Sequence, residues 1–306
     1  MSRIGFKELV QLADRNKMAG ELLESFYFAC RTKNLTTSTL DGYAERLSYL
    51  VRYGQEINKD IDEITYKDLQ RYVLSIVDKV SSATVNGRIR VYRLFFKHLL
   101  EEGLIDENPA SRLNLIKQEK KIKPVLSAEE MGLILSKINR RSFHGARNYC
   151  MILLTYDSML RLNELLSIKL DEINLAEKIV KIHGKGRKDR FVPFSDKTAR
   201  SLHTYLIKFR KGINFDYLFP MQNGEKIKYR RAHNIFAQSG KKVGLYVYPH
   251  LVRHSAASQF ARSGGSIAIL QKVLGHSSLT VTQRYVHLST EDMQAAYDRF
   301  SPAGCL

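Results

Sequence analysis

The chain has 306 residues, of which 44% are hydrophobic, and its formal net charge is +18. The hydrophobic fraction suffices for packed cores and excludes wholesale disorder, and the length exceeds the size at which one core keeps growing, which predicts two domains. The charge indicates a polyanionic partner. Residues 1–117 hold 18 Lys and Arg against 16 Asp and Glu, whereas residues 118–306 hold 31 against 15. A generic basic protein would not need this asymmetry.

The cysteines and the apolar runs indicate the compartment. Cys30, Cys150 and Cys305 are odd in number, far apart and in no metal-ligand spacing, which fits a reduced intracellular setting. The N-terminus has no long apolar core, and the most apolar run, residues 150–154, is far too short to span a bilayer. We therefore expect a soluble, cytoplasmic protein that makes no membrane contact.

Residues 1–117 are predicted to form a helical domain. A helix-like distribution of apolar residues begins near Glu21, and two further helices are expected to start at cap signatures, Ser38 with Asp41 and Thr65 with Asp68. Residues 118–124 are polar and basic and end in proline, which predicts an inter-domain linker, although an ordinary solvated loop has the same composition.

The helix predicted over about residues 82–102 has two distinct faces. One is an apolar stripe of Val85, Ile89, Tyr92, Phe96 and Leu99. The other is polar and basic, and it carries Asn86, Arg90, Arg93 and Lys97. For an isolated helix the second face would be a solvated surface, and its functional interpretation is contact with nucleic-acid phosphates.

Residues 125–306 are predicted to form a second domain that is mainly α-helical with a small antiparallel sheet. Ser127 and Glu130 make a capping box, and residues 147–157 read as a buried helix. The β-type runs 178–182 and 190–194 flank a glycine-rich tip and predict a hairpin. Near the C-terminus, residues 289–301 predict a tail helix with one apolar stripe.

Six residues of this domain carry the chemistry of a possible phosphodiester reaction. A tyrosine hydroxyl is a poor nucleophile at neutral pH unless cations or acid–base groups activate it. Arginines can hold non-bridging phosphate oxygens through paired hydrogen bonds, and lysine and histidine can move protons. Alone, the tyrosine would be a packing residue, and it is the ordered set that indicates attack on a phosphodiester: Arg161, Lys185, His250, Arg253, His276 and Tyr285.

These residues lie in motifs that resemble the tyrosine recombinase family, which includes the phage integrases and the Xer-type enzymes. The matching motifs are Leu160-Arg161-Leu162-Asn163-Glu164, Gly184-Lys185-Gly186, His250-x-x-Arg253-His254 and Leu274-Gly275-His276 followed by Tyr285. One departure is visible: the family often has a glycine two residues before the first arginine, where this chain has Met159.

The resemblance implies a two-domain DNA clamp, in which a helical, SAM-like core-binding domain precedes a mixed catalytic domain. It also implies a site-specific recombinase. Tyr285 would attack the scissile phosphate and form a 3′-phosphotyrosyl link, and strand exchange would pass through a Holliday junction.

The same resemblance implies a role for each site residue. Arg161, Arg253 and His276 would stabilise the transition state. His250 would assist proton removal from Tyr285, and Lys185 would protonate the leaving 5′ oxygen. A supporting residue that orients an arginine or a base, and candidates for DNA contact, complete the expected site: Glu164, then Arg90, Arg93, Lys97, Arg187, Lys188, Arg230 and Arg231.

The expected partner is a double-stranded DNA recombination site bound by a homotetramer, with a monomer or weak dimer off DNA and the C-terminal tail docking on a neighbouring protomer. No cofactor and no metal are expected. Three alternatives stay open: a type IB topoisomerase or telomere resolvase with the same constellation, a DNA-binding regulator with a dead site, and a structural basic protein.

Overall fold

The computed structural model describes residues 4–13, 17–118, 124–184, 189–212 and 215–275. The chain divides into two compact units, Met1–Lys121 and Ile122–Leu306. Each unit has a hydrophobic core of its own, and each is therefore described by itself.

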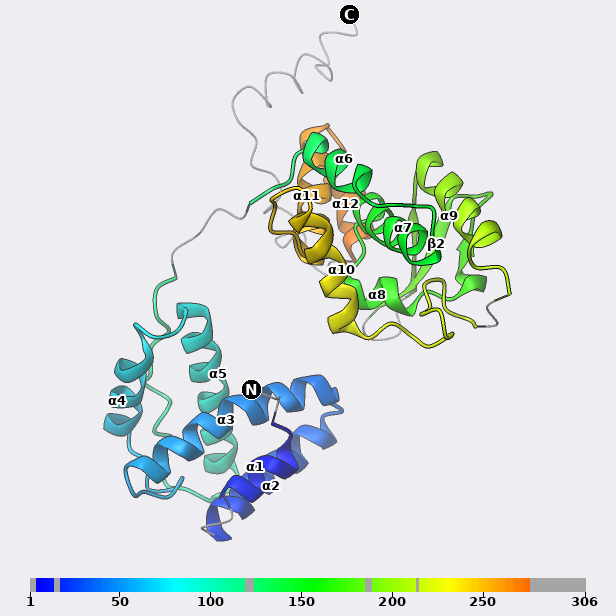
Figure 1. The fold of residues 1–306 in the computed structure, drawn as a ribbon. Coiled ribbons are helices and arrows are strands. Elements are labelled where there is room, and N and C mark those ends of the chain that lie inside the picture. The colour runs from blue at the N-terminus through cyan, green and yellow to red at the C-terminus, as the bar shows by residue number, and fades with distance from the viewer. Residues whose placement is uncertain (1–3, 14–16, 119–123, 185–188, 213–214, 276–306) are drawn as a thin grey trace, which may run out of the picture. The chain divides into compact units, whose positions relative to one another are not determined.

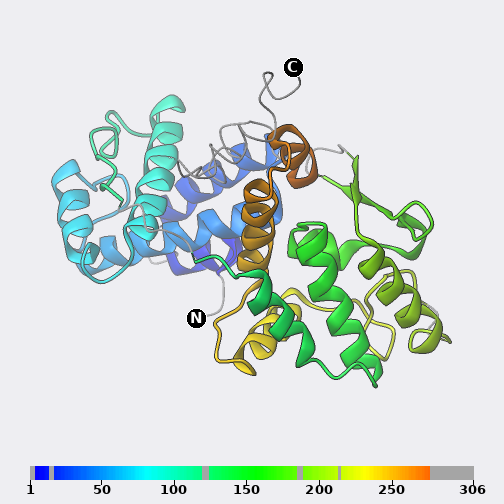
Figure 2. The same ribbon diagram turned by 90° about the horizontal axis from the view of Figure 1, so that it is seen from above.

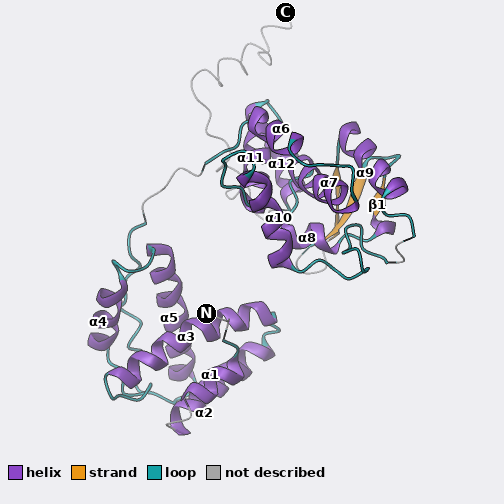
Figure 3. Ribbon diagram, viewed as in Figure 1, coloured by secondary structure: helices purple, strands orange, loops and turns teal. Residues whose placement is uncertain are grey.

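In the residues that the structure describes, the first unit is built from helices (Figures 1 and 3). Their apolar faces meet in one core, where Leu9, Leu23, Leu47 and Phe95 have no exposed surface. The helices are α1 (Phe6–Ala13), α2 (Lys17–Thr32), α3 (Thr37–Glu56), α4 (Tyr66–Ile76) and α5 (Ser82–Glu101).

Helix α5 confirms its predicted range and its apolar stripe, since all five stripe residues are buried. Part of the opposite face has a structural role that the sequence did not reveal. Asn86 is buried, and its amide exchanges two hydrogen bonds with the backbone of Ile116, at 2.9 and 2.8 Å. Asn86 therefore ties the last segment of this unit to α5.

One of the two predicted helix starts is correct and one is wrong. Helix α4 begins with a capping box. The Asp68 carboxylate accepts from the backbone N–H of Thr65, and the backbone N–H of Asp68 donates to the Thr65 hydroxyl. Helix α3 begins earlier than predicted, because Thr36 is the cap and Ser38 lies inside the helix. Successive hydroxyl residues offered several caps, and the chain uses the first of them.

The second unit confirms the predicted mainly α class with a small sheet (Figure 3). Three antiparallel strands lie in the order β1–β2–β3, and Val180 pairs with Val192. The elements are α6 (Ala128–Ser136), α7 (Phe143–Asp157), α8 (Leu162–Ser167), the 3-10 helix η1 (Leu170–Glu172), β1 (Ile173–Asn174), β2 (Ile179–His183), β3 (Asp189–Pro193), α9 (Asp196–Lys208), α10 (Tyr229–Lys241), α11 (Pro249–Arg262) and α12 (Ile267–Leu274).

Helix α7 is the buried centre of this unit. It starts four residues before the predicted position because Ser142 caps it, accepting from the backbone N–H of Gly145 at 3.2 Å. The run Cys150–Leu154 is buried, as its composition predicts, and α7 packs against both α9 and α11.

Helices α11 and α12 lie side by side, as Figures 1 and 2 show. Ala256 and Ala257 of α11 pack on Leu270 and Leu274 of α12, and Met159 completes this small cluster. The small alanine side chains let the two helices approach closely.

No helix among the described residues is long and apolar enough to cross a membrane. The predicted tail helix over residues 289–301 lies outside the described residues.

Candidate functional site

Three arginines from three separate elements surround one carboxylate in the second unit. Glu164 lies 2.9 Å from a terminal nitrogen of Arg161, 2.9 Å from one of Arg190 and 3.7 Å from one of Arg253. The Glu164 side chain is only 10% exposed. Two of these arginines, and Glu164, are residues that the sequence predicts for the site.

Glu164 reaches this position because it closes the first turn of α8. Arg161 is the N-cap residue, and its backbone N–H donates to Glu164 Oε2 at 2.9 Å, while its Nη1 donates to Oε1. This is the carboxylate half of a capping box, which satisfies a backbone donor at the helix start. The cap therefore fixes Arg161 and Glu164 with respect to each other, and buried Leu162, Leu165 and Leu166 anchor the turn.

The environment of Glu164 keeps it ionised. Burial raises the pKa of this carboxyl, but hydrogen bonds from Arg190 and Arg161 outweigh burial, and the pKa falls below its ordinary value. A carboxylate held by three cations neutralises only one of them, so the cluster remains positively charged.

Arg253 projects from α11 and is almost fully buried. Its two terminal nitrogens donate to the carbonyl of Met159 at 2.7 Å and to that of Leu274 at 2.9 Å. His250 lies one turn earlier on the same helix and is exposed. The spacing of three residues places both on one side of α11, as the sequence predicts.

The turn before Arg161 contains Met159 at the position where the family often has a glycine. Its φ is +51°, in the left-handed region that glycine adopts most readily. Its carbonyl accepts from Arg253 and its side chain is buried against α11 and α12. The left-handed turn therefore forms here without a glycine.

Arg190 is a member of the cluster that the sequence interpretation missed. It lies on β3, its side chain is 14% exposed, and it donates to both oxygens of Glu164. A signal was present: alternation along a strand places Arg190 on the same face as buried Val192, where an arginine needs a partner.

A second charged group lies next to the tip of the β2–β3 hairpin, at its last residue pair, and was also missed. His183 contacts Asp189 at 2.7 Å through Nδ1 and Glu172 through Nε2, and Lys181 lies 3.1 Å from Asp189. Hydrogen bonds to Asp189 and Glu172 raise the pKa of His183. These contacts tie this end of the hairpin to η1.

Several predicted residues lie outside the described residues. They are Lys185, Arg187, Lys188, His276 and Tyr285. The structure does bring the residue before His276 to the site, since Gly275 ends α12 next to Arg190 of the arginine cluster.

The remaining DNA-contact candidates are placed differently from one another. Arg90 on α5 is exposed, and Arg230 and Arg231 are exposed on the first turn of α10. Lys97 forms a 3.4 Å ion pair with Glu101. Arg93 is half-buried and donates to the carbonyl of Leu113, so at least part of its guanidinium serves the fold of the first unit.

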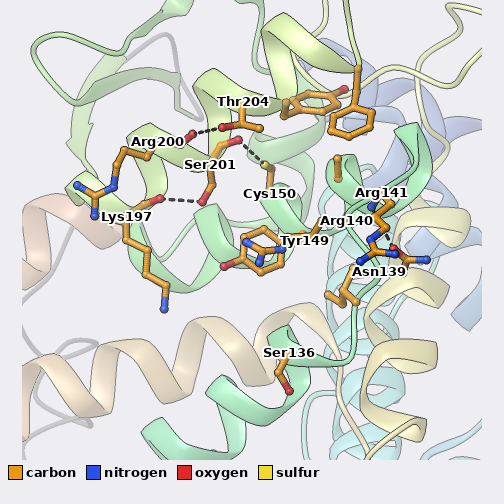
Figure 4. A pocket seen from close by; sticks show the side chains of 14 residues that line it. Ser136, Asn139, Arg140, Arg141, Tyr149, Cys150, Lys197, Arg200, Ser201 and Thr204 are labelled. Atoms are coloured by element: carbon orange, nitrogen blue, oxygen red, sulfur yellow. Dashed lines mark hydrogen bonds between the residues drawn. The ribbon is translucent and has the colours of Figure 1, made fainter.

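A hollow of about 670 Å³ lies elsewhere in the second unit, between α7, α9 and the loop after α6 (Figure 4). Arg140, Arg141, Lys197 and Arg200 line it together with aromatic and hydroxyl side chains, and the Arg140 guanidinium lies 4.7 Å from the centre of the Tyr149 ring. None of the residues predicted for the site lines this hollow. The candidate site is instead the arginine cluster, in which the Arg161 side chain is 39% exposed and those of Glu164, Arg190 and Arg253 are mostly buried.

Comparison with known proteins identifies the family. Residues 124–292 match the phage integrase family, and residues 22–106 match the N-terminal SAM-like domain of phage integrases. The chain belongs to the phage integrase family.

Within that family it is a tyrosine recombinase of the Xer type. Tyrosine recombinase XerC of Bacillus pumilus is 31% identical over 281 residues, which covers 88% of this chain and 92% of the relative. XerC of Bacillus subtilis is 29% identical over the same length and with the same coverage.

Solved structures share the fold. The XerH recombinase in a post-cleavage complex with palindromic difH substrate aligns with a TM-score of 0.74 and 20% identity, covering 97% of each chain. The Tn1549 transposon integrase bound to transposon right end DNA also gives 0.74 and 20%, covering 92% of this chain and 99% of the other. The XerA recombinase gives 0.52 and 26%, covering 92% and 98%.

Proposed function

We propose that the protein is a site-specific DNA recombinase that cleaves and rejoins strands through a 3′-phosphotyrosyl intermediate and a Holliday junction. The observation that carries this proposal is the arginine cluster. Arg161 and Arg253 come from different helices and share the carboxylate of Glu164. Three guanidinium groups against one carboxylate leave a surplus of positive charge, which a phosphodiester and its transition state can neutralise.

The chemistry that we assign to the site begins with Tyr285. Its hydroxyl attacks the scissile phosphate and frees a 5′-hydroxyl, while Arg161, Arg253 and His276 stabilise the charge on the transition state. His250 assists removal of the tyrosine proton, and Glu164 holds Arg161 in place. The phosphotyrosyl bond conserves the energy of the phosphodiester, so rejoining needs no ATP.

The leaving group requires an acid, and we assign that role to Lys185. An alkoxide at the 5′ position is a poor leaving group, and a positioned acid contributes about 10²–10⁴-fold in rate. The ordered β2–β3 hairpin supports the assignment, because Lys185 follows β2 by two residues.

The partner that we propose is a double-stranded recombination site held by both units. Residues 1–117 would be the core-binding domain, residues 118–124 the linker and residues 125–306 the catalytic domain. Exchange between two sites requires four protomers, and we propose a homotetramer on DNA with the C-terminal tail docked on a neighbour. XerH, the Tn1549 integrase and λ integrase are relatives in fold whose structures were solved with DNA.

A topoisomerase-like enzyme would share the cleavage chemistry but would only relax DNA. Recombination of two marked sites on one plasmid separates the two functions, since relaxation leaves the order of the markers unchanged. The similarity to XerC over 88% of the chain favours recombination.

The proposal is tested by Tyr285→Phe with DNA that carries the recombination site. We expect near-normal affinity for DNA, because binding depends on many phosphate contacts and falls steeply with salt, and no covalent protein–DNA adduct on denaturing gels. An adduct that persists in this variant would place the nucleophile elsewhere, with Tyr297 as the next candidate.

The role of Lys185 is tested separately with a substrate that carries sulfur at the 5′-bridging position. A thiolate leaves without protonation, so Lys185→Ala should slow cleavage of normal DNA by about 10²–10⁴-fold but cleave the sulfur substrate at nearly the unmutated rate. Arg161→Ala should stay slow on both. Equal damage to both substrates in the lysine variant would mean that Lys185 positions DNA and that another residue, such as Lys188, is the acid.

A further inference from the structure

We infer that Arg190 is a positioning residue for the proposed strand-cleavage reaction: it fixes Arg161, through Glu164, relative to the end of α12. The inference rests on the proposed function and adds a residue that lies outside the six proposed to act on the phosphodiester. Its basis is the set of contacts that one half-buried guanidinium makes with two other elements.

The contacts of Arg190 use both edges of its guanidinium. Nη1 and Nη2 donate to the two oxygens of Glu164, at 3.1 and 2.9 Å. Nε donates to the carbonyl of Val273 at 3.1 Å. A planar fork that pairs with a carboxylate fixes direction as well as distance, which a lysine ammonium cannot do.

Through these contacts Arg190 joins three elements that lie far apart in the sequence. Its own strand, β3, leads back to the hairpin tip that carries Lys185. Glu164 belongs to α8 and holds Arg161. Val273 is in the last turn of α12, where helix carbonyls have no partner within the helix and attract cations.

The end of α12 is held from two sides. Arg190 binds the carbonyl of Val273, and Arg253 binds that of the next residue, Leu274. Gly275 then ends the helix with a φ of +62°. A side chain there would place its Cβ 3.1–3.2 Å from the Arg190 guanidinium, a tight contact, so a glycine favours both the turn and the approach of this arginine.

Arg161 and Arg253, the two arginines proposed to bind the phosphate, are therefore held by the same set of contacts as the start of the segment that contains His276. His276 follows Gly275 directly in the sequence. If Arg190 is removed, Glu164 loses two of its hydrogen bonds and the last turn of α12 loses one. Displacement of a reacting group by about 1 Å lowers a rate by about 100-fold.

The test compares Arg190→Ala, Arg190→Lys and, as a matched control, Arg200→Ala, which removes an exposed arginine of the same unit. Single-turnover cleavage is measured in preformed complexes with a nicked suicide substrate, alongside DNA affinity and melting temperature. We expect both Arg190 variants to cleave about 100-fold more slowly, with affinity within about threefold of the unmutated protein, and the control to match the unmutated protein in cleavage.

A double-mutant cycle with Glu164→Gln shows whether Arg190 acts through the carboxylate. Residues that act through one contact are non-additive, so Arg190→Lys should slow the Glu164→Gln protein by no more than about threefold. Full cleavage by Arg190→Lys, or additive losses in the double variant, would overturn the inference. A loss of DNA affinity as large as the loss in rate would also overturn it, since the role would then be structural only. Absence of cleavage by the unmutated protein would instead count against the proposed function.

Discussion

Asp68 in the first unit and Glu164 in the second occupy the same position in the same local motif. Each is the third residue of a helix and accepts from the backbone N–H of the N-cap residue, at 3.0 Å for Asp68 and 2.9 Å for Glu164. They differ in their cations. Asp68 has Lys59 at 2.7 Å and a largely exposed Arg71 at 4.0 Å, whereas Glu164 has three arginines.

The difference separates a structural carboxylate from one in a functional site. Around Asp68, one close ammonium balances one carboxylate, which satisfies a buried group and leaves little charge for a ligand. Around Glu164, three arginines face one carboxylate, so this group of four side chains carries a net positive charge. The surplus of arginine, and not the capping motif, distinguishes the second site and is the basis for the phosphate binding that we propose there.

Among the variants that test this comparison, the largest effect should come from removing part of that surplus. Arg253→Ala should slow DNA cleavage in preformed complexes by about 10²–10³-fold, because a donor to the transition-state charge is lost. Lys59→Ala, the matched change at the balanced carboxylate, should leave that rate within about threefold and lower the melting temperature instead. If both variants slowed cleavage equally, the comparison would fail.

An intermediate effect is expected at Asp68, and it concerns stability. Burial raises the pKa of this carboxyl, but hydrogen bonds from Lys59 and Thr65 outweigh burial and lower it from 3.8 to about 2. A depressed pKa contributes stability that is present above the unfolded value and is lost as the pH falls through the folded value, here about 2 kcal/mol.

Asp68→Asn should therefore weaken the protection of the α4 amides from hydrogen exchange at pH 7. The difference in protection between the variant and the unmutated protein should shrink between pH 4 and pH 2. Asp62→Asn changes an exposed carboxylate nearby and serves as the control. A difference that stays constant down to pH 2 would mean that the charge of Asp68 contributes nothing.

The smallest effect is expected at His183. Here one imidazole lies between two carboxylates, so the anions outnumber the cation, which is the opposite charge balance to that of the arginine cluster. Because its pKa is raised, the contribution of the imidazolium is present below about pH 6.5 and is lost as the pH rises through the raised value. Hydrogen exchange of the β2–β3 amides should accelerate over that range, beyond the intrinsic pH dependence, by no more than about fivefold for an exposed pair. His183→Gln should remove this extra pH dependence, and an unchanged profile in the variant would assign it to another group.

Local patterns predicted much of the fold and part of the site. Spacing of apolar residues gave α5 its range, and the Thr65–Asp68 and Ser127–Glu130 signatures gave two helix starts, because these features depend on neighbours within one turn. The contact of Arg161 with Glu164, and the place of His250 and Arg253 on one side of α11, were predictable for the same reason, whereas their selection as site residues came from the family resemblance.

The parts that the sequence could not supply depend on distant contacts. Arg190 meets Glu164 across 26 residues and Val273 across 83, and no local pattern encodes either pairing. The Arg93 guanidinium donates to the carbonyl of Leu113, 20 residues away. It is therefore less available for DNA contact than its place on a basic helical face suggests. At the start of α3, several adjacent hydroxyl residues gave equally good local signals, and the choice of Thr36 could not be read from them.

The left-handed Met159 means that one backbone turn can be encoded in two ways. A non-glycine residue in this conformation is strained by about 1 kcal/mol, and burial of a methionine side chain contributes about 2 kcal/mol in return. Glycine would relieve the strain and forgo the burial, so the two alternatives lie close in free energy, and a lineage can drift between them without disturbing the carbonyl that Arg253 binds. A motif search that demands glycine at this position would overlook this chain.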